Sequence, residues 1–327
     1  MRVAHKTVGQ NVILIENSAY QVILIKKYQA LQLYSKRIYF VLLLLLYSTL
    51  LSQQITIENK NNFAVEIAYK NQKVILKGGE SKTISDRDIA YLYLQNSNKK
   101  NMETHRVPIF LHFKDSLKIT IDDFNKPIEF KGKNESLHNI IVNQQHYILY
   151  KHIAKYQDIL YNKRNTRELI NFSELVLRDY FNKINKSFNA SLDKDSEIYK
   201  RMEKYVINDW LASVYLFLTG GKTLDLRSRE LILYYYNKYI KKGIEHYNCE
   251  YKVEYNIISD LAKWINQMNI NLPKYPIIEN TKDDSINQYL PQSCQKYYFI
   301  NYFNYYDHIN SPQKEYYKKI LKEKFNN

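Results

Sequence analysis

The chain has 327 residues, enough for about two domains of ordinary size. Glycine and proline together supply only 13 residues (7 and 6), which excludes collagen-like and flexible linker sequences. With 45% apolar and 14% aromatic residues the chain is able to bury a core, which excludes global disorder.

The formal net charge is +15, from 48 lysines and arginines against 33 aspartates and glutamates. The basic residues are spread along the chain and nowhere form a block of five or six. A nucleic-acid binder gathers such residues on one element or one face, so this distribution favours a solvated basic surface. We expect no nucleic-acid partner, and a basic nucleic-acid or membrane-surface binding protein stays as an alternative.

The sharpest local signal is an apolar run near the start. Lys36 and Arg37 precede a fourteen-residue run, Ile38–Leu51, and Ser52 and Gln53 follow it. A membrane span needs about 20 apolar residues, whereas the hydrophobic region of a signal peptide needs about 7 to 15. The run therefore predicts a signal peptide that is cleaved between Ser52 and Gln53. An uncleaved signal that anchors the chain in the inner membrane is the first alternative, and a buried core element is the second.

Residues 1–52 are accordingly an upstream segment followed by the signal peptide. Signal peptides commonly begin within a few residues of the initiator, and thirty-five residues precede the charged pair here. One hypothesis is that the native chain starts near residues 34–37 from a non-standard codon, because the next methionine is Met102. The mass of the native protein decides between that start and Met1.

Downstream of the signal peptide, apolar residues alternate in twos, which is the period of a half-buried strand. Leu117, Ile119 and Ile121, for example, are separated by lysine and threonine. Turn-forming residues interrupt this pattern about every 8 to 12 residues, a spacing that is typical of all-β domains. The pattern predicts a small antiparallel β-sandwich or barrel over residues 53–133.

From residue 134 to 327 the spacing changes to threes and fours, which is typical of amphipathic helices. Val206, Trp210 and Val214 form one such stripe. We predict an all-α domain after the β domain, and hence an α+β fold. The predicted helices span residues 135–162, 167–188, 194–218, 224–241, 252–269, 284–290, 294–308 and 312–325.

No complete catalytic or cofactor-binding motif is found in the sequence. Residues 219–223 (TGGKT) resemble the end of a phosphate-binding loop, but Leu216 stands where that motif has its first glycine. A predicted helix, not a strand, also precedes the segment. A Gly-Gly helix terminator explains the segment better than nucleotide binding does.

The eight histidines do not form a metal motif. His138, His146 and His152 lie in one predicted helix but not at the four-residue step that places two ligands on one face. His105 and His112 flank a predicted strand without a ligand at suitable spacing. We therefore predict no metal site.

Paired carboxylates stand at Asp122–Asp123 and Asp283–Asp284, beside turns or helix starts, where such residues most often cap the backbone. We predict no catalytic residue and no cofactor. The alternative is a hydrolase whose site is assembled from residues far apart in the sequence, such as His146 or Asp122.

Cys249 and Cys294 are the two cysteines of the chain. In an oxidising compartment they form one disulfide, which would stabilise the fold by roughly 4 kcal/mol through loop closure, or they remain two buried thiols. The sequence leaves both alternatives open, because it does not show whether the two Cβ atoms meet.

Tyrosines recur at helical spacing in two segments. Such stripes stack bases or sugars in some proteins, but more often they pack a helix while the hydroxyl reaches water or a carbonyl. We expect packing. The two stripes are Tyr298, Tyr302 and Tyr305, and Leu231, Tyr235 and Tyr239.

The junction of the two domains resembles a known family. The run Ile109–Thr120 (IFLHFKDSLKIT), the step Ile128–Asn134 (IEFKGKN) and the helix with His138 are similar to the segment before the redox domain of periplasmic thioredoxin-like thiol-disulfide interchange proteins. The resemblance covers about residues 53–308. It implies an export signal, a small β domain and a helical region, which form the non-catalytic N-terminal part of that family. The Cys-x-x-Cys pair and the thioredoxin unit have no counterpart here, so no catalytic residue carries over.

The sequence thus predicts an exported, non-enzymatic protein of a Gram-negative cell envelope, periplasmic or secreted. Its partner is an envelope protein or a small ligand. Contact with the membrane is expected only through the signal segment, if that segment is not cleaved.

Overall fold

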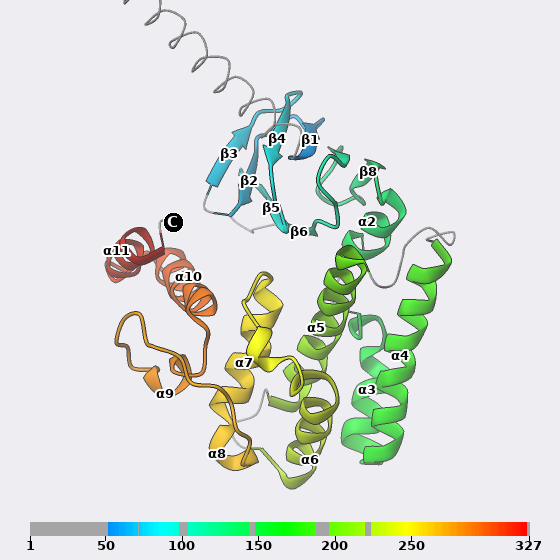
Figure 1. Cartoon of the computed structure of the whole chain (residues 1–327), viewed down its shortest axis with the longest axis vertical. Coiled ribbons are helices and arrows are strands. Elements are labelled where there is room, and N and C mark those ends of the chain that lie inside the picture. Colours follow the sequence, from blue (N-terminus) through cyan, green and yellow to red (C-terminus); the bar gives the residue numbers. More distant parts are fainter. Residues whose placement is uncertain are drawn as a thin grey trace, which may run out of the picture.

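The computed structural model describes residues 52–70, 72–97, 104–143, 148–187, 196–219 and 224–325. A β region comes first in the chain, and a helical region follows (Figure 1). The last strand ends at Gly132 and the first described helix begins at Glu135. The predicted α+β class is confirmed, and the change from strand to helix falls where the apolar spacing changes.

Two four-stranded sheets make up the β region. Every neighbouring pair in them is antiparallel except β1 and β7, which run parallel, with Ile55 opposite Leu117 and Ile57 opposite Ile119. The predicted antiparallel arrangement thus holds for every neighbouring pair but this one. In spatial order the first sheet holds β4 (Ser81–Asp86), β1 (Gln53–Asn59), β7 (Ser116–Ile121) and β8 (Glu129–Gly132), and the second holds β3 (Gln72–Leu76), β2 (Val65–Tyr69), β5 (Tyr91–Asn96) and β6 (Thr104–Pro108).

The core of the sandwich follows from the alternation of apolar residues. Ile55 and Ile57 of β1 are fully buried, whereas Thr56 between them is half-buried and bonds Thr83 of β4 through its hydroxyl (2.9 Å). Successive side chains of a strand point to opposite faces, so one face of each sheet supplies the core. Leu117 and Ile119 of the neighbouring strand β7 belong to the same core, and the second sheet contributes Val65, Ile67, Leu92 and Leu94.

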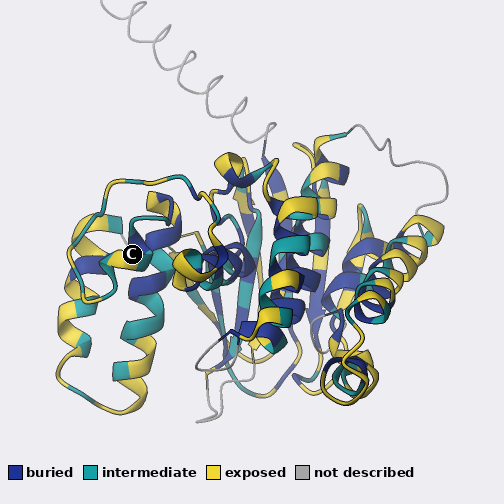
Figure 2. Cartoon of the chain, turned by 90° about the horizontal axis from the view of Figure 1, so that it is seen from below, coloured by how far each residue is buried: buried dark blue, intermediate teal, exposed yellow. Residues whose placement is uncertain are grey.

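The helical region contains these helices, in chain order: α2 (Glu135–Val142), α3 (Ile153–Gln157), α4 (Thr166–Ser187), α5 (Glu197–Thr219), α6 (Leu226–Tyr235), α7 (Lys252–Lys263), α8 (Ile265–Met268), α9 (Asp284–Asn287), α10 (Gln292–His308) and α11 (Lys314–Phe325). Short 3₁₀ or π turns extend α3 at both ends and α6 at its end. Figure 2 shows several helices that are buried on one side and exposed on the other, as amphipathic spacing predicts. The helix α5 differs, because residues 208–215 are all buried.

The prediction of one helix over residues 135–162 was wrong. The helix α2 ends at Val142, because the side chain of the next residue, Asn143, is held by the β region. Its amide oxygen accepts from Ile128 N and its amide nitrogen donates to Ile128 O, both at 2.8 Å. A residue with both side-chain groups engaged in this way fixes the helix end.

The helix α5 lies at the centre of the helical core. Trp210 is fully buried, and its indole nitrogen donates to the carbonyl oxygen of Ser173 in α4 (3.0 Å). The hydroxyls of Ser173 and of Tyr235 in α6 are 2.7 Å apart. The stripe predicted around Trp210 is therefore the surface on which α4 and α6 pack.

The two regions are joined by an ion pair and by a chain of rings. Arg201 of α5 lies 3.1 Å from Asp88 of the β region and 3.5 Å from Glu250. A series of rings crosses the boundary between the regions, and the centres of neighbouring rings are no more than 6.0 Å apart. Both regions therefore contribute aromatic side chains to one set of ring contacts. In order the rings are Tyr93, Tyr91, Tyr251, Tyr205, Phe110, His138 and Phe130.

Candidate functional site: an amide-lined pocket in the helical domain

A pocket of about 490 Å³ opens beside α8 in the helical domain. Sites for small ligands commonly have volumes of about 300 to 1,000 Å³. The wall consists of residues 265–266 and 269–274, which carry the chain from α8 into an irregular segment, and of Tyr289 from beyond α9. The pocket is thus formed by the connection between α7 and α10.

The end of α8 places amide groups on the rim of the pocket. Asn269 ends this helix with a φ of 49°, a left-handed conformation that asparagine tolerates better than most residues. Asn266 precedes this turn and Asn271 follows it, and all three side chains are exposed. Leu272 is buried below them and gives the pocket an apolar floor.

Hydrogen bonds hold the irregular wall of the pocket in place. The hydroxyl of Tyr236 donates to the carbonyl oxygen of Asn271 (3.0 Å), and Tyr275 N donates to the carbonyl oxygen of Gln288 (2.7 Å). The ammonium group of Lys274 lies 5.9 Å from the ring centre of Tyr289. Because these contacts come from three separate segments, the pocket has its shape before a ligand enters.

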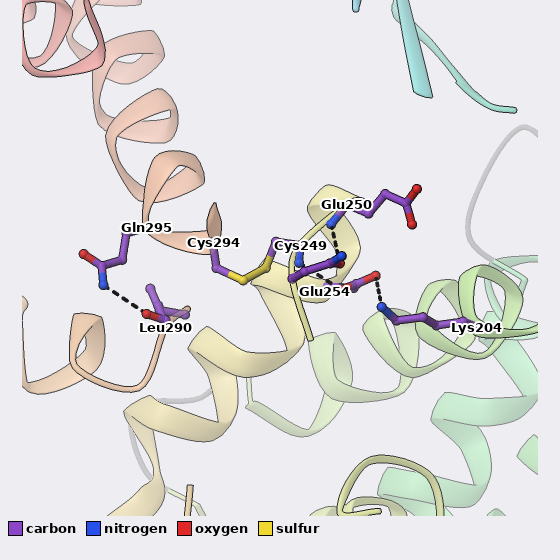
Figure 3. The surroundings of a disulfide bond; sticks show 8 residues. Lys204, Cys249, Glu250, Glu254, Leu290, Cys294 and Gln295 are labelled. Atoms are coloured by element: carbon purple, nitrogen blue, oxygen red, sulfur yellow. Dashed lines mark hydrogen bonds and ion pairs between the residues drawn. A yellow bond between two sulfur atoms is a disulfide. The ribbon is translucent and has the colours of Figure 1, made fainter. Parts of the chain in front are cut away.

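Gln295, near the start of α10, holds the irregular segment between α8 and α10 by hydrogen bonds. It is buried, and its amide oxygen accepts from Ile278 N (2.9 Å). Its amide nitrogen donates to the carbonyl oxygens of Pro276 (2.9 Å) and Leu290 (3.0 Å; Figure 3). One buried side chain therefore satisfies three backbone groups of a segment without regular structure.

A disulfide joins Cys249, before α7, to Cys294 in the first turn of α10 (Figure 3). The two Cα atoms are 5.0 Å apart, and both cysteines are buried. Of the two alternatives that the sequence leaves open, the structure has the bridge. It ties the start of α10 to the body of the helical domain.

Glu254 of α7 supports the backbone next to this disulfide. Its carboxylate accepts from Cys249 N (3.0 Å) and lies 3.1 Å from the ammonium group of Lys204 in α5 (Figure 3). Burial raises the pKa of Glu254, and Lys204 acts in the opposite direction. The carboxylate has a structural role here, because both of its oxygens are engaged by the protein.

The lining of the pocket is rich in groups that form hydrogen bonds. It offers three asparagines, a lysine and a tyrosine, and none of the described residues that line it is His, Asp, Glu or Cys. An asparagine amide both donates and accepts hydrogen bonds at neutral pH, but it does not transfer protons. Carboxyl groups with strongly raised pKa values lie elsewhere: burial raises the pKa of Asp209 to about 7 and that of Asp260 to about 6.

The sequence reasoning missed this pocket. Its signal was the group of asparagines in the irregular segment just before Pro273. Asparagine is frequent throughout this chain, so composition alone does not distinguish those in the pocket. The fold brings Tyr289 to them from the far side of α9.

His138 is buried between the two regions and belongs to the core. Its Nε2 accepts from Phe110 N (3.1 Å), and its Nδ1 lies 2.8 Å from the carbonyl oxygen of Asn134, to which it donates. Burial lowers the pKa of His138 to about 4, so the ring is neutral at pH 7. His138 therefore links the start of α2 to Phe110, which follows β6.

The other histidines named from the sequence do not converge on the pocket. His105 Nε2 lies 3.0 Å from the carbonyl oxygen of Phe124, His112 is exposed, and His152 lies against Phe172. His146, like the Gly-Gly-Lys-Thr segment at 220–223, lies outside the described residues. Within the described ranges, no group of three or more His, Cys, Asp or Glu side chains is placed to hold a metal ion.

The paired carboxylates act locally. Asp122 lies 3.5 Å from Lys60 on the surface, and Asp123 accepts from Asn125 N (2.9 Å) in a turn. Asp284 accepts from Thr281 N (2.7 Å) at the start of α9. Asp283 instead accepts from two tyrosines of α10, Tyr298 and Tyr302, both at 2.9 Å.

The tyrosine stripes mainly pack helices, as expected. Tyr235 and Tyr298 are buried, and Tyr239 shares the carboxylate of Glu174 with a neighbouring tyrosine. Tyr305 is the exception, because more than half of its surface is exposed. Packing therefore does not account for the end of the α10 stripe.

The predicted signal-cleavage site lies directly before the first residue of β1. Gln53 is the first residue of β1, is buried, and bonds Leu111 O and Ile89 N through its side chain. The apolar run Ile38–Leu51 lies outside the described residues. In the part of the chain that the structure describes, no helix has the length and apolar character needed to cross a membrane.

The buried disulfide fits an oxidising, extracytoplasmic location. Compared with models of known protein families and with curated proteins, the sequence matches none. The resemblance to the N-terminal region of thioredoxin-like thiol-disulfide interchange proteins therefore stays a prediction.

Proposed function

We propose that the chain is an exported, non-enzymatic protein of a Gram-negative cell envelope that binds a small neutral ligand, a saccharide, in the pocket beside α8. The observation that carries this proposal is the lining of the pocket. It combines three amides with an aromatic ring, and none of its described residues is a carboxylate or a histidine. A hydrolase, the alternative, most often uses such groups as its general acid and base.

The chemistry of the lining is that of hydroxyl recognition. A sugar hydroxyl both donates and accepts, and the amides of Asn266, Asn269 and Asn271 do the same. The ring of Tyr289 offers an apolar face to the C–H groups of a sugar. The single charged group, Lys274, adds hydrogen-bond donors without making the pocket strongly selective for anions.

Two observations support export. The disulfide is stable in an oxidising compartment, and β1 begins at the residue that follows the predicted cleavage site. A mature chain that starts at Gln53 would keep every described strand.

Isothermal titration tests the ligand, with maltotriose and N,N′-diacetylchitobiose as probes. We expect at least one of them to bind, and the double variant N266A/N271A to weaken binding about tenfold through the loss of two hydrogen-bonding groups. The matched control is Gln267→Ala, which removes an exposed amide from the same helix but outside the lining. Equal losses in the two variants, or no binding of either saccharide, would refute the saccharide site. Cleavage of a bound saccharide would favour the hydrolase.

Cell fractionation and intact-mass measurement test export. We expect the protein in the periplasmic or secreted fraction, with a mass that corresponds to residues 53–327 and one disulfide. Recovery from the cytosol with residues before Ser52 still attached would refute export but would leave the pocket experiment unaffected.

A further inference from the structure

Tyrosines pack between α10 and α11, which lie side by side at the edge of the helical region (Figure 1). Tyr317 of α11 faces Tyr302 and Tyr306 of α10, with ring centres 5.3 and 5.4 Å away and ring planes inclined by 11° and 20°. Nearly parallel, offset rings at this distance are in contact. The hairpin therefore brings phenol rings from two helices together.

Two exposed tyrosines connect this stack to the surface. Tyr305 is 57% exposed and Tyr316 is 48% exposed. Their ring centres lie 5.1 Å from those of Tyr306 and Tyr317, respectively. Electrons pass readily between aromatic rings that are in contact, so an oxidant that meets an exposed ring is able to withdraw an electron from the stack. The exposed end of the α10 stripe would thus serve as the point of entry.

A carboxylate is positioned to take a phenolic proton from the stack. Asp283, directly before α9, accepts from the hydroxyls of Tyr302 and Tyr298, both at 2.9 Å. A phenol loses an electron more easily when its proton moves to a hydrogen-bonded base in the same step, because no positively charged ring has to form.

The surroundings of Tyr302 make this coupled step more favourable than loss of an electron alone. The ammonium group of Lys282 lies 5.2 Å from the ring centre of Tyr302 and would repel a positively charged ring. Tyr306 packs on Tyr317 almost as Tyr302 does, but makes no hydrogen bond to a carboxylate of the described chain. Of the two tyrosines of α10 that face Tyr317, Tyr302 is therefore the one prepared for oxidation.

We propose that this stack is a site of oxidative modification, at which a haem peroxidase and hydrogen peroxide join Tyr302 to Tyr317 as dityrosine. Each phenol loses one electron and one proton, and the proton of Tyr302 moves to Asp283 while that of Tyr317 moves to water. The two radicals couple at the ring carbons next to their oxygens, which forms one carbon–carbon bond. The hydrogens on these two carbons then move to the oxygens and restore the phenols. Hydrogen peroxide takes up the two electrons and two protons and becomes two molecules of water.

The cross-link would complete the covalent attachment of α10. The disulfide joins the first turn of this helix to the segment before α7, and the new bond would join its second half to α11. A carbon–carbon bond is not opened by thiols, so the hairpin would stay closed even where the disulfide is reduced. The site is independent of the pocket beside α8.

Treatment of the purified protein with a haem peroxidase and hydrogen peroxide tests the inference. We expect the blue fluorescence of dityrosine in a monomer whose mass is lower by two hydrogen atoms. Trypsin cuts after lysine and releases residues 297–314 and 315–318 as separate peptides. Mass spectrometry should find these two peptides joined, and fragmentation should place the bond at Tyr302 and Tyr317.

Three variants test the role of the hydrogen bond to the carboxylate. Y302F removes the phenol that is bonded to Asp283 and should remove most of the cross-link. Y306F is the matched control, because it changes a ring with nearly the same packing on Tyr317 and should keep most of the yield. D283N keeps an acceptor but not a base, so the initial rate of cross-linking should fall about tenfold or more.

Tyr161→Phe is the control for exposure. Tyr161 is 58% exposed and lies far from the hairpin in the sequence, so its replacement should leave the yield unchanged. Circular dichroism and unfolding midpoints verify that all variants fold.

Three outcomes would overturn the inference. The first is an equal yield in Y302F and Y306F, and the second is an unchanged rate in D283N. The third is fluorescence that appears only in covalent dimers and rises with protein concentration. That result would show that the exposed rings of Tyr305 and Tyr316 couple between molecules instead.

Discussion

Glu254 shows how a single buried carboxylate supports the disulfide region. It has no exposed surface, yet it is ionisable and pairs with Lys204. Because burial raises its pKa, the ionised form costs free energy in the fold, and this cost grows as the pH rises through the raised pKa. The contact that must be kept is the acceptor for Cys249 N.

We therefore predict that E254Q changes the free energy of unfolding by less than about 1 kcal/mol, because glutamine keeps an acceptor and removes a buried charge. E254A should cost about 2 to 3 kcal/mol, because it leaves a buried amide unsatisfied and opens a cavity. Urea unfolding at pH 7 measures both. Equal losses in the two variants would mean that the ion pair, not the hydrogen bond, carries the effect.

His138 predicts a pH dependence of stability. Its folded pKa of about 4 lies below its ordinary value of 6.5, so the folded state binds fewer protons than the unfolded state between these values. The contribution of neutral His138 to the free energy of unfolding is fully present above pH 6.5. It is lost as the pH falls toward 4, and the loss is up to about 3 kcal/mol. Asp209, with its pKa raised to about 7, acts in the opposite direction over much of the same range.

The test therefore compares the pH dependence of the free energy of unfolding in the unchanged protein and in H138Q. The glutamine keeps an acceptor for Phe110 N. From pH 7.5 down to 4.5, the free energy of unfolding of H138Q should fall less than that of the unchanged protein. Denaturant titrations across this range give the two slopes, and Asp209 contributes equally to both. Parallel slopes would contradict a buried neutral histidine.

At the scale of elements, the disulfide determines how firmly α10 is attached. Closing a loop between cysteines 45 positions apart should stabilise the fold by about 4 kcal/mol in the chain-entropy account. We predict that C249S/C294S loses about 2 to 5 kcal/mol and that hydrogen exchange accelerates first in α10 and α11. Reductant should destabilise the unchanged protein by a similar amount and leave the variant unaffected. Two free thiols in the denatured, unreduced protein would rule out the bridge.

The elements also show which features a sequence predicts. The alternation around Leu117 and Ile119 and the stripe around Trp210 each predicted residues that the structure buries. The end of α2 depends on Asn143 reaching back to Ile128, and the parallel pairing of β1 with β7 joins distant strands. Neither contact can be predicted from the spacing of apolar residues, because each joins segments that are far apart in the sequence.

The candidate site was less predictable than the fold for the same reason. The pocket lies in an irregular connection, where backbone hydrogen bonds to Tyr236 and Gln295 replace regular structure. The cysteines were recognised as a pair, but only their positions in space decide between a bridge and two thiols. Exposure of Tyr305 likewise depends on how far α11 covers α10.

At the scale of the whole molecule, the buried rings across the boundary argue that the two regions act as one unit. Tyr251 connects the two regions in this series of rings, with ring centres 5.9 Å from Tyr91 in β5 and 4.9 Å from Tyr205 in α5. It is almost fully buried. A large buried side chain that contacts both regions couples their unfolding, because neither region can open without exposing it.

We therefore predict a single calorimetric transition for the protein, with equal calorimetric and van't Hoff enthalpies. Tyr251→Ala should lower the free energy of unfolding by about 3 to 5 kcal/mol and separate the transition into two, because it leaves a cavity at the boundary. Tyr251→Phe is the control, since the Tyr251 hydroxyl makes no hydrogen bond to any described residue. It should keep one transition at an unchanged or higher midpoint, because it removes an unsatisfied buried hydroxyl. If Tyr251→Ala also unfolds in one transition of unchanged enthalpy ratio, coupling between the regions depends on Arg201 and the other boundary contacts instead.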